Sequence, residues 1–126
     1  MNSFIITALL AYFGHFFGDY ILQTDFLAKA KNRHSEINSV DRHGWIGYLI
    51  AHCYMWGVSV YAPMFWYEWE AGKSFMVALI LFVANTVIHF SVDWLKCEKK
   101  TTLLIDQLIH SVQIAVSLAI LFLAYR

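Results

Sequence analysis

Apolar residues occur in four long blocks along the chain, separated by short polar segments. The blocks cover about residues 3–23, 45–67, 74–95 and 103–125. A helix that crosses the hydrocarbon core of a bilayer needs roughly 20 predominantly apolar residues. Each block reaches this length, and the segments between them are too short to hold a separate domain. The pattern therefore predicts an all-α fold, a four-transmembrane-helix bundle that forms a single integral membrane domain over residues 1–126.

The composition supports this prediction and excludes other classes. Of the 126 residues, 60% are hydrophobic and 14% are charged, whereas soluble domains carry about 25% charged residues. The net charge is zero and no basic patch is present, so we expect no nucleic-acid partner. Cys53 and Cys97 fall in different blocks and do not form a disulfide framework. We interpret Cys53 as a buried, apolar-like residue and Cys97 as a thiol at a helix end.

The first block differs from a secretory signal peptide. No Lys or Arg precedes it, and it carries His15 and Asp19 where a signal peptide has a plain apolar core. We therefore expect it to be retained as a membrane helix.

The distribution of basic residues predicts the orientation in the membrane. Loops rich in Lys and Arg stay in the cytoplasm. Most of the nine Lys and Arg residues fall in the first and third loops. These are Lys29, Lys31, Arg33, Arg42, Lys96, Lys99 and Lys100. We expect a multi-pass protein of the bacterial inner membrane, with both of these loops in the cytoplasm and both termini outside it. Trp45 and Trp94 would then anchor the inner interface, and Trp66 and Trp69 the outer one.

Seven ionisable residues lie within the apolar blocks. They are His15, Asp19, His52, His89, Asp93, Asp106 and His110. A charged group at the bilayer centre costs roughly 2.5–3.5 kcal/mol even on the most lenient scale. Seven such groups cannot each face lipid, so we expect them to face one another, water or an ion.

The spacing of these residues indicates that they converge. Six of them form pairs four residues apart, and such pairs share one face of a helix. The pairs are His15/Asp19, His89/Asp93 and Asp106/His110. The order of His and Asp reverses between helices of opposite direction. We therefore expect the four histidines at one depth and the three aspartates nearer the cytoplasm.

A short motif is repeated in the chain. His-Phe-x-x-Asp occurs at residues 15–19 and again at residues 89–93, and His52 and His110 follow at matching places in the next block. This repeat suggests a duplicated helical hairpin.

Histidine and aspartate are usual ligands of zinc and other divalent first-row metals. We predict a divalent metal site, most simply zinc, drawn from all seven residues, with Asp19, Asp93 and Asp106 also as catalytic candidates. Every Lys and Arg is expected in a loop or at a terminus, so the ion would supply the missing positive charge. The alternative is a metal-free hydrogen-bonded network, and no HExxH-type signature decides between them. Other polar residues are expected to form helix–helix hydrogen bonds: Gln23, Thr24, Asn85, Gln107 and Gln113.

Three functions fit these features. The first is a metal-dependent hydrolase acting near the inner leaflet on a lipid or lipid-phosphate substrate. Basic loop residues would attract its headgroup or only set the topology: Lys29, Lys31, Arg42, Lys96 and Lys99. The second is a binding or transport protein for metal ions or protons, although the outer halves of the blocks lack ionisable residues. The third is a regulatory or structural subunit of a membrane complex. A homo-oligomer is compatible with each.

The polar positions also resemble those of a known family. The stretch from His15 to Ala28, HFFGDYILQTDFLA, is similar to the opening signature of domain of unknown function 3307, a family of small bacterial and phage membrane proteins. Two further matches are His89-x-x-x-Asp93-x-x-Lys96 and Ile105-Asp106-Gln107-x-x-His110, and His52 is consistent with a family histidine. The resemblance covers nearly the whole chain. It implies the four-helix fold and the polar positions but no activity.

Overall fold

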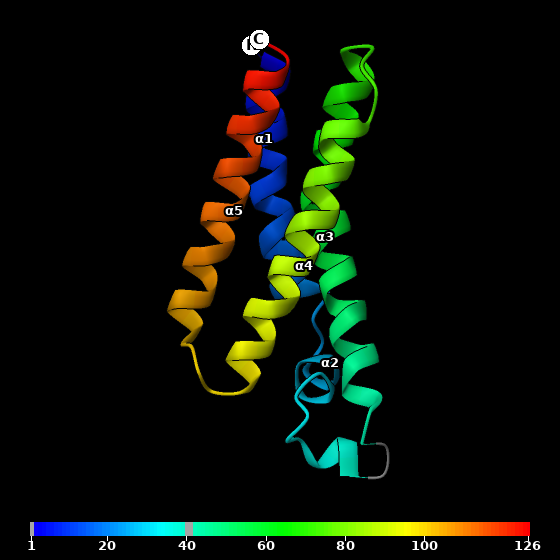
Figure 1. The fold of residues 1–126 in the computed structure, drawn as a ribbon, viewed down its shortest axis with the longest axis vertical. Coiled ribbons are helices and arrows are strands. Elements are labelled where there is room, and N and C mark those ends of the chain that lie inside the picture. Colours follow the sequence, from blue (N-terminus) through cyan, green and yellow to red (C-terminus); the bar gives the residue numbers. More distant parts are fainter. Residues whose placement is uncertain (1, 40–41) are drawn as a thin grey trace.

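The computed structural model describes residues 2–39 and 42–126, and every regular element in them is helical. Four long helical segments run along the longest axis of the molecule (Figure 1). They are α1 (Asn2–Phe16) continued by the π-helix η1 (Phe17–Ile21), α3 (Gly44–Glu70), α4 (Met76–Cys97) and α5 (Leu103–Ala124). The predicted all-α class is confirmed.

The long helices pack in a ring in which each lies beside its neighbours along the chain. α3 contacts both α1 and α4, and α5 contacts α4 and α1. Both termini lie together at one end with the turn between α3 and α4, which we call the terminal end (Figure 1). The short helix α2 (Asp25–Ala30) and the turn between α4 and α5 lie at the opposite end, the α2 end. This order is the one that two consecutive hairpins, α1–α3 and α4–α5, would produce.

Three of the helical segments are long and apolar enough to cross a membrane. They are Ser3–Ile21, Met76–Cys97 and Leu103–Ala124. At a rise of about 1.5 Å per residue, the 27 residues of α3 are also long enough. Its composition is less apolar because it contains many Tyr and Trp residues, Pro63 and two terminal glutamates. The membrane character predicted from the sequence is therefore supported for three segments by length and composition together.

The predicted element boundaries differ from the structure at the α2 end. The first predicted loop contains α2 and a 3-10 helix, η2 (Glu36–Ser39), which are too short to give a periodic pattern. Thr24 is not a helix–helix contact, because its side chain accepts a hydrogen bond from the Leu27 amide and caps α2. α4 continues to Cys97, two residues beyond its predicted end. The prediction that every Lys and Arg lies in a loop or at a terminus is therefore wrong for Lys96.

A glycine lets α1 and α3 approach closely. Pro63 has no amide hydrogen, so the carbonyl of Ser59 one turn earlier lacks its usual helical donor. That carbonyl oxygen lies against Gly14, where an added Cβ would be only 2.1 Å from it. Small residues at helix–helix contacts are typical of membrane bundles, because they let the backbones pack together.

The interior of the bundle is divided along its length. An apolar core fills the half nearer the terminal end, with Tyr61, Met64, Leu81 and Leu121 among its buried members. The half nearer the α2 end is filled by the polar residues predicted to converge. Many large apolar side chains on the outside are exposed, which is the arrangement expected of a surface in contact with lipid.

A buried glutamate closes the terminal end. The Glu68 side chain is fully buried, and its carboxylate accepts a hydrogen bond from the Ala78 amide in the first turn of α4. The Tyr125 hydroxyl donates to the same carboxylate. A negative charge at a helix N-terminus is favourable because it faces unpaired amides and the positive end of the helix dipole. Glu68 thus joins the ends of α3, α4 and α5.

Candidate metal centre

The structure brings the seven predicted residues together inside the bundle. All four histidines are at most 1% exposed, and the three aspartates are at most 8% exposed. α1 and η1 contribute His15 and Asp19, α3 contributes His52, α4 contributes His89 and Asp93, and α5 contributes Asp106 and His110. Residues from all four long helical segments therefore form one cluster. Their predicted roles as metal ligands and catalytic groups stay predictions.

Three of the imidazoles form a continuous chain. His52 Nε2 lies 3.3 Å from His89 Nε2, and His89 Nδ1 lies 3.2 Å from His110 Nδ1. The indole of Trp56 stacks on His89, with ring centroids 4.0 Å apart and an interplanar angle of 11°. Its Nε1 donates to His15 Nδ1 at 2.9 Å. Because an indole can only donate, His15 Nδ1 is an unprotonated acceptor, and its ring proton is on Nε2.

A π-helical turn places Asp19 in the cluster. Turns of this kind are frequent at functional sites, because the extra residue per turn displaces a side chain from its usual α-helical position. Gly18 within the turn allows contact with α3, since an added Cβ would lie 3.0 Å from the Trp56 Cα. The Asp19 carboxylate is thereby placed among His15, His52 and His89. Gln107 Nε2 donates to it at 3.1 Å.

Two lysines neutralise the other aspartates. Lys31, in the turn that ends α2, is 2% exposed, and its ammonium group binds Asp93 Oδ2 and Gln23 Oε1. Lys96 lies 2.6 Å from Asp93 Oδ1 and 2.8 Å from Asp106 Oδ2. The expectation that no Lys or Arg supplies positive charge to the buried carboxylates is wrong for Asp93 and Asp106. The physical reason is that α2 folds back against the bundle and that Lys96 points inward from the last turn of α4.

The same contacts change the interpretation of the basic residues. Lys31 and Lys96 are engaged with buried carboxylates, so their position does not suit them to attract a lipid headgroup. Gln23, expected to form a helix–helix hydrogen bond, binds the ammonium group of Lys31 instead.

Asp19 differs from the other two aspartates. In the part of the chain that the structure describes, no Lys or Arg side chain forms an ion pair with it; its ionisable neighbours are His15, His52 and His89, at 3.5, 3.6 and 3.9 Å. The two ammonium groups of the cluster pair with Asp93 and Asp106. The Asp19 carboxylate is therefore the charge that has no lysine or arginine partner among the described residues.

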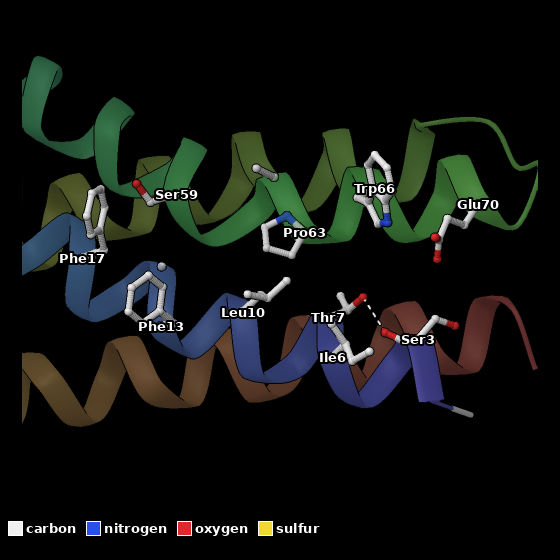
Figure 2. Close-up of a pocket in the computed structure, with 12 residues that line it drawn as sticks. Ser3, Ile6, Thr7, Leu10, Phe13, Phe17, Ser59, Pro63, Trp66 and Glu70 are labelled. Carbon is white, nitrogen blue, oxygen red and sulfur yellow. Dashed lines mark hydrogen bonds between the residues drawn. The ribbon is translucent and has the colours of Figure 1, made fainter.

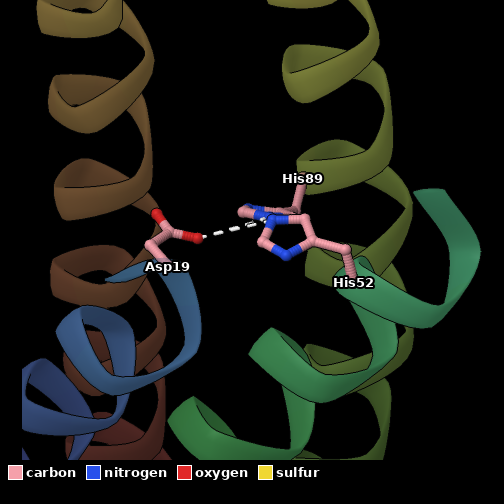
Figure 3. Close-up of side chains that lie close together, drawn as sticks. All are labelled: Asp19, His52 and His89. Carbon is pink, nitrogen blue, oxygen red and sulfur yellow. Dashed lines mark hydrogen bonds and ion pairs between the residues drawn. The ribbon is translucent and has the colours of Figure 1, made fainter. Parts of the chain in front are cut away.

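Three donor atoms around that charge have the spacing of metal ligands. Asp19, His52 and His89 each offer one atom, and these atoms lie within 4.8 Å of one another (Figure 3). The three separations are 3.3 Å between the two imidazole nitrogens, and 3.6 and 3.9 Å from these nitrogens to the carboxylate oxygen. Ligands of a tetrahedral zinc ion at about 2.0–2.1 Å lie about 3.3–3.4 Å apart. The two nitrogens have this spacing, and the carboxylate oxygen lies slightly farther from each of them.

A second group of donors overlaps the first. Cys53 Sγ, one nitrogen of His89 and one oxygen of Asp93 also lie within 4.8 Å of one another. Cys53 is 1% exposed, as its apolar-like interpretation requires. No pattern in the sequence connects Cys53 with α4, because its proximity to His89 arises only from the packing of α3 against α4.

Polar contacts continue from His110 toward the middle of the bundle. Gln113 Oε1 lies 2.9 Å from His110 Nδ1, and Gln113 Nε2 donates to Asn85 Oδ1 at 3.1 Å. Asn85 donates to Ser117 Oγ, which also lies 3.0 Å from the Tyr61 hydroxyl. The predicted helix–helix hydrogen bonds of Asn85 and Gln113 are confirmed. Beyond Tyr61 the apolar core begins.

Two surface grooves differ in their relation to the cluster. A groove of about 540 Å³ between α1 and α3 is mostly apolar and lies toward the terminal end, between Leu10 and Phe13 on one side and Pro63 and Trp66 on the other (Figure 2). A second groove of about 370 Å³ lies between α4 and α5, and Asn85 and Gln113 are its polar members. Of these two grooves, as lined by described residues, the second reaches Gln113, which is hydrogen-bonded to His110.

The fold and the cluster define an all-helical protein with several helices able to span a membrane and a buried group of His and Asp side chains. The chain matches the family described as Protein of unknown function (DUF3307) over residues 5–125, and it belongs to that family. Comparisons with curated proteins and with solved structures found no match. The family resemblance of the sequence is thereby confirmed, while the family description assigns no activity.

Proposed function

We propose that this protein is a multi-pass membrane protein that binds one divalent metal ion, most simply zinc, through Asp19, His52 and His89. The observation that carries the proposal is the buried Asp19 carboxylate, which has no lysine or arginine partner in the described part of the chain. Its carboxylate is buried among imidazoles, while the lysines of the cluster pair with the other two aspartates. A buried charge is costly unless it is paired, and a divalent ion would both neutralise Asp19 and use the adjacent imidazole nitrogens.

The polar neighbours of His52 support this assignment. His52 Nδ1 has no hydrogen-bond partner among the described residues, whereas Nε2 faces His89 and Asp19. A neutral imidazole carries its proton on one nitrogen and is an acceptor at the other. The polar neighbours of His52 thus gather on the Nε2 side, where a metal ligand would need its lone pair.

The membrane arrangement that we propose has four spans. α3 lies between α1 and α4 in the ring, so a membrane that surrounds its neighbours would surround α3 as well. The α2 end would face the cytoplasm, because Lys29, Arg42, Lys99 and Lys100 are at that end, and both termini would lie outside. Labelling of an introduced cysteine, Ser35→Cys in a Cys97→Ser background, tests this. Labelling from the cytoplasm is expected, and labelling from the periplasm would reverse the orientation.

For the reaction, we propose hydrolysis of a lipid-like substrate. Three protein ligands leave one tetrahedral position open, and a zinc ion there would supply a Lewis acid and an activated water. His110 would position His89, since its Nδ1 lies 3.2 Å from His89 Nδ1 and Asp106 Oδ1, 3.2 Å from its Nε2, orients the ring. The groove between α4 and α5 would admit an apolar chain from the side, past Gln113.

Transport of ions or protons across the bundle is less well supported. The buried residues between Tyr61 and the terminal end are mostly apolar, including Met64, Leu81 and Leu121. Among the described residues, the polar contacts that begin at His110 therefore do not extend to Glu68. A structural role of the cluster in a membrane complex is the second alternative, and measurement of bound metal distinguishes it from both metal-dependent functions.

Elemental analysis of detergent-purified protein tests the metal site. One equivalent of metal per chain is expected in the wild type, with near-complete loss in Asp19→Asn and His89→Ala. His34→Ala is the matched control, because this histidine is 59% exposed and outside the cluster. A chelator should lower the melting temperature of the wild type and the control but not of Asp19→Asn. Wild-type protein that takes up no metal and melts identically with and without chelator would end the proposal.

The hydrolase is tested separately with the metal-loaded protein. Incubation with a total polar lipid extract, followed by mass spectrometry, should reveal a product that requires both the metal and His110. Metal binding without any such product would retain the metal centre and reject the hydrolase.

A further inference from the structure

We infer that the cluster contains a second, overlapping ion position, formed by Cys53, His89 and Asp93, which takes a thiophilic cation such as Cd²⁺ or Cu⁺. This inference rests on the proposed function for its competition with zinc at Asp19, His52 and His89, although binding at Cys53 can be measured independently. It assigns a ligand role to the buried thiol, which the hydrolytic proposal does not use.

The geometry of the second position is that of a mixed sulfur, nitrogen and oxygen site. The three donor atoms lie within 4.8 Å of one another, and all three side chains are at most 1% exposed. Thiolate ligands select soft ions, whereas imidazole and carboxylate donors accept a wider range of divalent metals. The two positions therefore differ in the ion that each prefers, although they lie side by side.

Only one of the positions can be filled at a time. His89 is shared between the two groups. Two cations side by side in a buried site would also repel each other strongly. A thiophilic ion at Cys53 is thus expected to displace zinc from the first position.

Binding at the second position involves no redox change. A bond forms between Cys53 Sγ and the cation, and the thiol proton is released to solvent. Asp93 keeps its contact with Lys96 at Oδ1, and its Oδ2, which binds Lys31, also lies 3.5 Å from His52 Nε2.

A cadmium titration of the zinc-loaded protein tests the inference. Near-ultraviolet absorption from thiolate-to-cadmium charge transfer should grow to one equivalent per chain, with release of one equivalent of zinc. Cys53→Ser should lose the band and keep its zinc. Cys97→Ser is the matched control, because this half-buried thiol at the end of α4 belongs to neither donor group, and it should behave as the wild type.

The results separate this inference from the proposed function. A band that persists in Cys53→Ser, or that is lost only in Cys97→Ser, would overturn the second position while the zinc site stands. Protein that binds no zinc but gives a Cys53-dependent cadmium band would support the second position and reject the first. If Cys53→Ser does not fold, X-ray absorption at the cadmium edge of the Cys97→Ser protein decides the question. A cadmium–sulfur distance in that protein can come only from Cys53 or from a methionine. Its loss after alkylation of Cys53 supports the second position, and its persistence would overturn it.

Discussion

Lys31→Met is expected to destabilise the protein strongly. The Lys31 side chain is 3% exposed and that of Asp93 is fully buried, so the substitution removes a partner from a buried ion pair. Removal of one partner from such a pair costs roughly 3–5 kcal/mol, because the remaining charge stays buried. Asp93 retains Lys96 at 2.6 Å, which places the loss near the lower end. We expect about 3 kcal/mol, or roughly a hundredfold change in the unfolding equilibrium.

Reversible unfolding in mixed micelles, followed by far-ultraviolet circular dichroism, measures this loss. Lys29→Met is the matched control, since it makes the same substitution at an exposed position in α2, two residues earlier, and it should change the free energy of unfolding by less than about 0.5 kcal/mol. The double variant Lys31→Met with Asp93→Asn should recover most of the stability, because it removes the charge together with its partner. Equal stability of the two single lysine variants, or strictly additive losses in the double variant, would refute the inward-facing ion pair.

Three further predictions concern packing and surface charge. Gly14→Ala should destabilise the bundle by about 1–3 kcal/mol in the same assay, because the added Cβ would lie 2.1 Å from a backbone oxygen of α3. Gly47→Ala is the control and should not destabilise it, because there is open space around the added Cβ. Tyr125→Phe should cost about 1 kcal/mol of unfolding free energy at neutral pH. Burial and the Glu68 carboxylate raise the pKa of Tyr125 to about 12, so the stabilisation by its hydroxyl holds below the ordinary tyrosine pKa and is lost as the pH rises through about 12. An alkaline unfolding profile that is the same in Tyr125→Phe and the wild type would contradict this prediction. Desolvation acts to raise the pKa of Glu98, but hydrogen bonds led by that from Arg33 lower this pKa on balance. The stabilisation by Glu98 is therefore present above the ordinary glutamate pKa and is lost as the pH falls through the lowered value. Arg33→Gln should flatten this acid dependence of the unfolding free energy, and an identical profile would count against the Arg33–Glu98 pair.

The hydrophobic pattern was sufficient to predict the long helices. Blocks of about 20 apolar residues have few structural solutions, and each corresponds to a helical segment of nearly the predicted length. The convergence of His and Asp was also visible, because the spacing of four residues fixes which side chains share a helix face. Helix α2 was missed, since six residues cannot show a periodic pattern, and its stability comes from the Thr24 cap and from docking on the bundle.

The lysines of the cluster could not be assigned from the pattern. A charged residue at the end of an apolar block signals an interface, and whether its flexible side chain points to water or inward depends on a carboxylate within reach. For Lys96 the nearest signal is the pairing with Asp93 three residues earlier. For Lys31 no local signal exists, because the residue reaches Asp93 only through the fold of the preceding segment. Cys53 was similarly ambiguous, as a buried thiol packs like any small apolar group.

The stack of Trp56 on His89 gives this protein a built-in optical reporter. Trp56 is the fully buried tryptophan among the five in the chain, and its indole lies parallel to the imidazole with centroids 4.0 Å apart. A positive charge placed on the face of an indole interacts with its π electrons, and an adjacent imidazolium quenches indole fluorescence. Protonation of His89, or its ligation by a metal, will therefore change the emission of this one residue. Fluorescence of the unlabelled protein can follow the state of the cluster in real time, in detergent or in vesicles, without any substrate.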